Sequence, residues 1–177
     1  MLDDMEKGKK KKVKLKIHVE QITCDDDLFD PDSFLDYPED WDAPEGELER
    51  EEKPEIVDVF TEATRTETED GRVVISYRES ELTGMEGAKT ELSFFKDTPG
   101  LVSLYRSGSI YTLLTFEKGK RHICSYDTLY IPLEVCVYTT KVDNGLLSVP
   151  GRLEIVYIVE FHGAKAEYTK LQIELRQ

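Results

Sequence analysis

Cysteine and histidine are scarce in this sequence, which has three of each among 177 residues. Cys24, Cys124 and Cys136 are odd in number and irregularly spaced, so they form neither a disulfide framework nor a CxxC zinc site. The histidines at positions 18, 122 and 162 have no ligand partner at a regular spacing. We therefore expect reduced thiols, no metal and no cofactor.

Long apolar runs and glycine-rich phosphate loops are also missing. No window approaches the roughly 20 apolar residues of a membrane helix. The start, MLDDMEKGKKKKVKLK, lacks the apolar stretch of a signal peptide. Neither GxGxxG nor GxxxxGKS occurs. These absences predict a cytoplasmic protein that does not associate with membranes and has no motif for nucleotide phosphates.

The net charge of −14 comes from one segment. Sixteen acidic residues lie between Glu20 and Glu55, where the only bases are Arg50 and Lys53. We interpret residues 1–12 as a basic N-terminal tail and residues 13–177 as one β-barrel domain, interrupted by an acidic insertion over residues 24–55. The rest of the domain is nearly neutral, so the lysine run KGKKKK does not predict binding to nucleic acid.

The insertion has prolines, repelling charges and no alternation of apolar residues, which is typical of an irregular, solvated loop. Its aspartates lack the spacing, the central glycine and the terminal glutamate of a calcium-binding EF-hand. Aromatic residues are interleaved with the acids, and an alternative interpretation is a docking motif for a basic protein partner. The residues that would contact this partner are Phe29, Phe34, Tyr37 and Trp41.

Elsewhere apolar residues alternate with polar ones, as in half-buried β-strands. VKLKIHVEQI (13–22), RLEIVYIVEF (152–161) and TKLQIELR (169–176) each place one apolar face inward. Turn signals such as Asp70-Gly71, Ser107-Gly108 and Asn144-Gly145 separate the strands. The pattern predicts an all-β fold, an antiparallel up-and-down barrel of about 8–10 strands, because closure removes exposed sheet edges. Such a barrel is filled with side chains or holds one small ligand.

Several short motifs together resemble the YwiB-like family of uncharacterised bacterial proteins, a domain of unknown function. ISYRE places Tyr77 and Glu79 at positions typical of that family. The other motifs are Arg106-x-Gly108, Phe116-x-x-Gly119, His122-x-x-x-Tyr126-x-Thr128 and Ile131-Pro132-Leu133. The resemblance covers Val13 to about Arg176, apart from the insertion.

Two features depart from the family. Thr128-Leu129-Tyr130 stands where the family commonly has Thr followed by Pro-Tyr-Gly, and the insertion is longer and more acidic. The resemblance implies a calycin, lipocalin-like barrel. It implies no activity, catalytic residue or cofactor.

Arg106 is the strongest candidate for a functional residue. A guanidinium at the mouth of a barrel would receive a carboxylate or phosphate through paired hydrogen bonds. The alternative is that Arg106 caps the end of the barrel by bonding carbonyls or stacking on an aromatic ring. The predicted ligand-binding residues are Arg106, His122, Tyr126, Tyr77 and Tyr157.

Three functions remain open at this point. The first is a barrel that binds a small apolar or amphipathic molecule in its lumen. The second is a filled barrel that acts as an interaction module through its acidic-aromatic insertion. The third, which we do not expect, is an enzyme that uses His122, Tyr126 and Arg106. The sequence offers no orienting carboxylate for a catalytic pair of His122 and Cys124.

Overall fold

The computed structural model describes residues 8–23, 53–83, 85–127, 132–161 and 164–177, and these residues are almost entirely β-strand. The elements are β1 (Lys9–Thr23), β2 (Glu55–Glu67), β3 (Arg72–Arg78), the 3₁₀ turn η2 (Glu81–Thr83), β4 (Lys89–Phe95), β5 (Leu101–Ser107), β6 (Tyr111–Glu117), β7 (Arg121–Asp127), β8 (Pro132–Asn144), β9 (Gly151–Phe161) and β10 (Ala164–Arg176). The all-β prediction is confirmed. The proposed partner residues Phe29, Phe34, Tyr37 and Trp41 lie outside the described residues.

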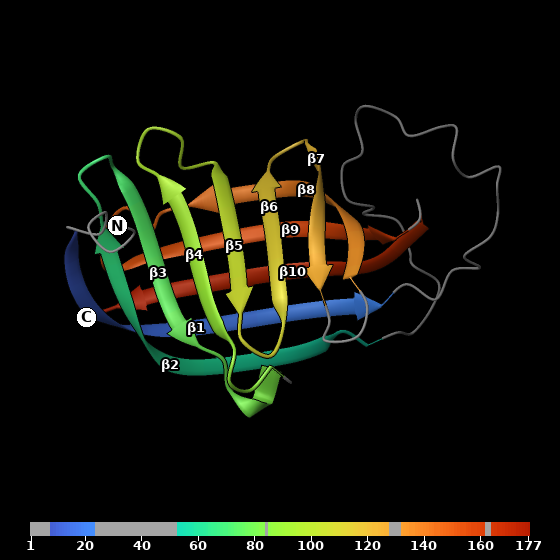
Figure 1. Cartoon of the computed structure of the whole chain (residues 1–177), viewed down its shortest axis with the longest axis horizontal. Helices are drawn as coiled ribbons and strands as arrows, with labels where there is room; N and C mark the ends of the chain where they lie inside the picture. Colours follow the sequence, from blue (N-terminus) through green and yellow to red (C-terminus); the bar gives the residue numbers. More distant parts are fainter. Residues whose placement is uncertain (1–7, 24–52, 84, 128–131, 162–163) are drawn as a thin grey trace.

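The strands form a closed barrel in the order β1-β10-β9-β8-β7-β6-β5-β4-β3-β2. Neighbours are antiparallel and, except at the closure between β1 and β10, consecutive in the chain, so the predicted up-and-down topology is confirmed with ten strands. In Figure 1 strands β3 to β7 run across strands β1, β8, β9 and β10, and β2 curves between the two layers. The barrel is therefore flattened into two crossing walls that enclose one interior.

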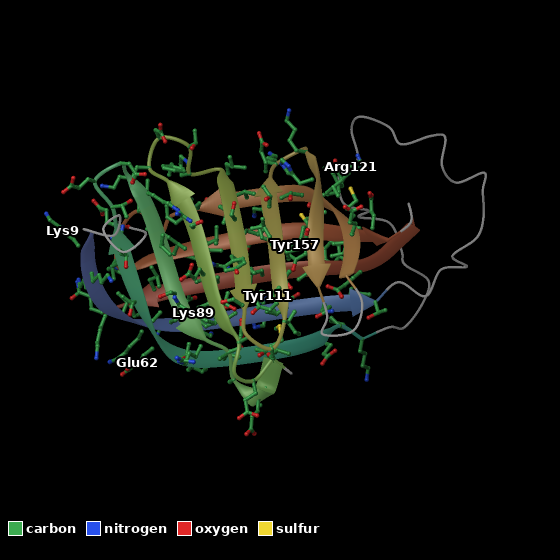
Figure 2. The ribbon with its side chains drawn as sticks, viewed as in Figure 1. Lys9, Glu62, Lys89, Tyr111, Arg121 and Tyr157 are labelled. Atoms are coloured by element: carbon green, nitrogen blue, oxygen red, sulfur yellow. The ribbon has the colours of Figure 1, made fainter. Side chains whose placement is uncertain are left out.

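The first strand begins earlier than predicted. Lys9–Lys12, which we interpreted as part of a basic N-terminal tail, belong to β1 and pair with Glu67–Thr64 of β2. The pairing uses peptide groups, so it continues past the last apolar residue, Val13. The lysine side chains stay in solvent, and Lys9 lies on the outside of the barrel (Figure 2). Apolar alternation therefore marks the buried part of the strand and not its end.

Apolar layers fill the end of the barrel where the β2–β3, β4–β5, β6–β7 and β8–β9 turns lie. At this end Val73 pairs with Phe94 and Val102 with Phe116, all buried. The next row toward the middle of the barrel consists of Ile75, Leu92, Leu104 and Leu114, which are also buried. Leu146, in the β8–β9 turn, is fully buried at this end. Its N–H donates to Asn144 Oδ1 at 3.0 Å, and Asn144 Nδ2 donates to the Pro99 carbonyl at 2.9 Å. No helix of the described part of the chain has the length and apolar character to cross a membrane.

Candidate ligand-binding site

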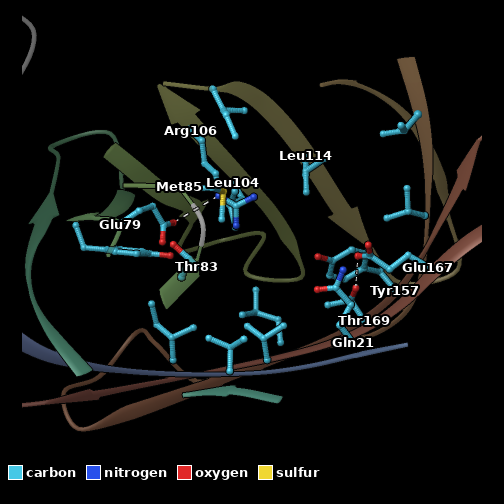
Figure 3. A pocket seen from close by; sticks show the side chains of 18 residues that line it. Gln21, Glu79, Thr83, Met85, Leu104, Arg106, Leu114, Tyr157, Glu167 and Thr169 are labelled. Carbon is cyan, nitrogen blue, oxygen red and sulfur yellow. Dashed lines mark hydrogen bonds and ion pairs between the residues drawn. The ribbon is translucent and has the colours of Figure 1, made fainter. Parts of the chain in front are cut away.

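The other end of the barrel is hollow. A cavity of about 610 Å³ lies where the β3–β4 and β5–β6 connections meet the interior, and its volume falls within the range of small-molecule sites. Figure 3 shows its lining side chains. Most are apolar, including Val19, Val57, Leu104, Leu114, Val159 and Leu171. The interior of this barrel is therefore not filled along its whole length.

A row of polar side chains crosses one wall of the interior. Tyr77 pairs with Thr90, Thr90 with Arg106, and Arg106 with Thr112, in strands β3 to β6. Tyr77, Thr90 and Thr112 are buried, and Arg106 is half-buried. The row lies two residues away, along each strand, from the apolar row that contains Leu92 and Leu104, and it therefore faces the same side of the sheet. Inward-facing residues thus change from apolar to polar at the level of the cavity.

Glu79 adds a buried carboxylate beside this row. Its side chain is 2% exposed, and Arg106 Nε lies 3.5 Å from Glu79 Oε1. The Thr90 hydroxyl donates a hydrogen bond to the same carboxylate oxygen. Burial, and then the negative charge of Glu79, raise the pKa of Tyr77 well above its usual range. The phenol therefore stays neutral beside the carboxylate.

The ion pair with Glu79 is made through one nitrogen of the Arg106 guanidinium group, Nε. The Arg106 side chain is 19% exposed and lines the cavity. Glu79 Oε1 is paired with Nε, and within the described residues the terminal nitrogens of Arg106 make no hydrogen bond. Two N–H₂ groups therefore remain available to an oxygen acceptor in the cavity.

A second polar row crosses the opposite wall. Gln21 pairs with Thr169, Thr169 with Tyr157, and Tyr157 with Thr139, in strands β1, β10, β9 and β8. The Tyr157 ring packs on Phe116, with ring centroids 4.8 Å apart, so Phe116 marks the boundary with the filled part of the barrel. Figure 3 shows Gln21, Tyr157, Glu167 and Thr169 together, across the cavity from Glu79 and Arg106.

Two buried hydroxyls in these rows lack a hydrogen-bond partner among the described residues, and the Nε of Arg106 has only its ion pair with Glu79. Thr112 Oγ1, Thr139 Oγ1 and Arg106 Nε are buried and make no hydrogen bond within the part of the chain that the structure describes. Buried polar atoms are normally hydrogen-bonded, since desolvation without a partner costs about 1–3 kcal/mol. Of the three residues, Arg106 lines the cavity.

Three of the five predicted ligand-binding residues line this cavity. Arg106, Tyr77 and Tyr157 are all among its lining side chains, although their role in binding stays a prediction. The alternative role of Arg106 as a cap receives no support within the described residues, where its partner is Glu79 and not a carbonyl or an aromatic ring.

His122 does not join this group. It lies at the other end of β7, where Nε2 is 3.2 Å from Glu117 Oε2. Tyr126, whose backbone pairs with Thr112 beside Arg106, is four residues further along the strand, about 13 Å from His122. The side chain of Tyr126 lies outside the described residues. His122 and Arg106 are therefore not assembled into a catalytic group.

Cys124 is also unsuited to nucleophilic chemistry. Its side chain is buried, and its Sγ lies 3.5 Å from the His122 carbonyl oxygen. Burial raises the pKa of the Cys124 thiol, which disfavours the reactive thiolate. No group of three or more His, Cys, Asp or Glu residues in the described ranges is arranged to hold a metal ion.

Sequence reasoning missed several lining residues. Glu79 was noted only as part of the ISYRE motif, because nothing local indicates that its partner Arg106 comes from two strands away. Glu167 was missed because the predicted inward face of the last strand began at Thr169. The alternation of Leu175, Ile173, Leu171 and Thr169, extended by one step, would have included it.

The comparisons with known proteins concern the fold and the family. The family model described as "Domain of unknown function (DUF1934)" matches residues 45–173, which include β2 to almost the end of β10 but not β1. The crystal structure of the ywiB protein from Bacillus subtilis is similar, with a TM-score of 0.60 and 19% sequence identity. The match covers 92% of each chain and, at this identity, shows the fold alone. No curated protein matches the sequence.

Proposed function

We propose that this protein, which belongs to the DUF1934 family of domains of unknown function, binds a small amphipathic molecule in its barrel lumen. The observation that carries the proposal is the cavity of about 610 Å³, whose apolar lining is interrupted by a few convergent polar groups. This combination is typical of small-molecule sites, where apolar area supplies affinity and polar groups fix the orientation.

Arg106 supplies the polar contact at one wall. Its terminal nitrogens donate to an oxygen of the ligand, while Glu79 holds the guanidinium in place through Nε. Because Glu79 already offsets the charge of Arg106, the acceptor need not be a full anion. A carbonyl, a hydroxyl or a carboxylate oxygen satisfies the same donors.

A neutral fluorescent probe tests the proposal without assuming the charge of the ligand. We expect N-phenyl-1-naphthylamine to bind and to gain fluorescence as it leaves water. Val19→Trp should abolish this binding, because Val19 is half-buried and its side chain lines the cavity. Leu101→Trp is the matched control, since Leu101 is 42% exposed on β5 and does not line the cavity.

Thermal unfolding of both variants shows whether each is folded before binding is compared. Native mass spectrometry of the protein purified from its host then looks for a retained small molecule. A wild-type protein that does not bind the probe contradicts the proposal. Equal binding by the folded Val19→Trp and Leu101→Trp variants contradicts it as well.

A further inference from the structure

Glu167 is a second carboxylate at the cavity, on the wall opposite Arg106. It lies on β10, where it pairs with Thr23 of β1 and Val159 of β9. The register of β10 against β9 shifts between Lys165 and Glu167, immediately before this residue. Glu167 continues the inward series of Leu171 and Thr169 and lines the cavity.

Among the described residues, the charges that line the cavity do not balance. Within the described residues, its charged side chains are Glu79, Arg106 and Glu167. Glu79 and Arg106 form an ion pair, whereas no ion pair between Glu167 and a described basic residue is found. The contact of Glu167 is with Thr169, whose hydroxyl donates to Oε1 at 2.8 Å. One negative charge at the cavity therefore lacks a counterion in the described part of the chain.

The surroundings of Glu167 favour a cation that donates hydrogen bonds. Taking a carboxylate partly out of water is unfavourable unless an opposite charge or donors replace the water. Gln21 and Tyr157 add further polar atoms on the same wall (Figure 3). The described residues hold no cluster of ligands for a metal ion, so the cation that fits is organic.

We infer that Glu167 binds a protonated amine, and that the ligand of the lumen is an amine-bearing amphiphile. This inference rests on the proposed function and adds the class of the ligand. The ammonium group lies against Glu167, with Gln21 and Thr169 beside it. The apolar chain contacts Val19, Val159 and Leu171, and an acceptor at its far end reaches the terminal nitrogens of Arg106.

Displacement of N-phenyl-1-naphthylamine by three ligands of equal chain length tests the inference. At pH 7 we expect decylamine to displace the probe about tenfold better than decanol, the size of effect for one charge-assisted hydrogen bond. Decanoate should be the weakest of the three, because its charge is repelled by Glu167. All measurements use the full chain at one low salt concentration.

Glu167→Gln keeps the shape of the side chain and removes its charge. It should reduce the advantage of decylamine over decanol to less than about twofold and leave decanol unchanged. Glu174→Gln is the matched control on the same strand, because Glu174 faces outward and pairs with Arg176 at 2.8 Å. Thr169→Val, which removes the hydroxyl on the Glu167 carboxylate, should weaken decylamine selectively and replaces Glu167→Gln if that variant does not fold.

The outcomes separate the two proposals. If the probe binds but decylamine has no advantage over decanol, the inference is wrong and the proposed function stands. An advantage that survives in Glu167→Gln, or that Glu174→Gln removes equally, also overturns the inference. If the wild-type protein binds no probe, the proposed function fails and the inference fails with it.

Discussion

The buried ion pair of Glu79 and Arg106 affects the stability of the barrel interior. Glu79 is nearly inaccessible to water, and Arg106 is its counterion at 3.5 Å. A buried pair of this kind contributes little net stability, but losing one partner is costly because the other charge remains buried. Arg106 is therefore important to the fold whether or not it binds a ligand.

Arg106→Met should lower the free energy of unfolding by about 3 kcal/mol, because it leaves the Glu79 carboxylate without a counterion. The double variant Glu79→Gln/Arg106→Met removes both charges and should recover most of this loss. Urea unfolding at pH 7 measures the free energy of unfolding for all three proteins. If the double variant is no more stable than Arg106→Met, the ion pair is not the reason for the loss.

His18, on the outer face of β1, should make stability depend on pH. Hydrogen bonds to Asp58 at 2.9 Å and Glu20 at 3.1 Å favour its protonated form and raise its pKa above 6.5. The stabilisation that these hydrogen bonds provide is fully present below the pKa of His18 in the unfolded chain, near 6.5. It is lost as the pH rises through the higher pKa of His18 in the folded protein.

We expect His18→Gln to be less stable than the wild-type protein at pH 5.5, by about 0.2–1 kcal/mol as for solvent-exposed ion pairs. The difference should disappear by pH 9. Unfolding in urea at both pH values checks it. A difference that grows between pH 5.5 and pH 9 contradicts the raised pKa of His18.

The connections between strands decide how closely the walls approach one another. In the β5–β6 turn, Gly108 has a φ of +121° and packs against the β3–β4 connection. A Cβ atom at this position would lie 2.9 Å from the Gly87 carbonyl oxygen. The turn therefore requires glycine both for its backbone conformation and for its close contact.

Gly108→Ala should destabilise the protein more than Gly119→Ala does. Gly119 also has a positive φ, of +76°, but no atom lies within 4 Å of a Cβ built there. Gly119→Ala should cost about 1–2 kcal/mol for the backbone conformation alone, and Gly108→Ala should cost at least about 1 kcal/mol more. If thermal unfolding shows that Gly108→Ala and Gly119→Ala lose equal stability, the β3–β4 connection moves to accommodate the added Cβ atom without cost.

The whole molecule is one closed barrel with a packed end and a hollow end. The packed end contains the apolar layers around Phe116 and Leu146, and the strands and turns that hold these layers are among the described residues. Residues 24–52 connect β1 and β2 at the other end, where Gln21 pairs with Glu55. The stability of the barrel should thus depend little on this connection.

Replacing residues 24–52 with a four-residue Gly/Ser loop should leave the barrel folded, because Gln21 and Glu55 are already paired and a shorter loop costs less entropy to close. Thermal and urea unfolding measure the change, and a Gly/Ser loop of the original length is the control. A loss of more than about 3 kcal/mol in both proteins would mean that Phe34 or Trp41 belongs to the core.

Local sequence patterns are sufficient to predict the class of fold, the positions of most strands and the inward faces of β1, β9 and β10. These features depend on alternation and turn residues, which are local properties of the chain. The family resemblance was also correct, since the motifs around Tyr77, Gly108 and Gly119 are contiguous in sequence.

The polar residues that meet in the interior could not be predicted from local patterns, because their contacts depend on how the strands pair. Glu79, Thr90 and Arg106 come together because β3, β4 and β5 pair in one register, and a shift of one residue would turn them outward. Tertiary structure also separated His122 from Arg106, which lie only 16 positions apart in sequence. Alternation specifies which face a side chain takes, whereas register and closure specify its neighbours and the volume left between the walls.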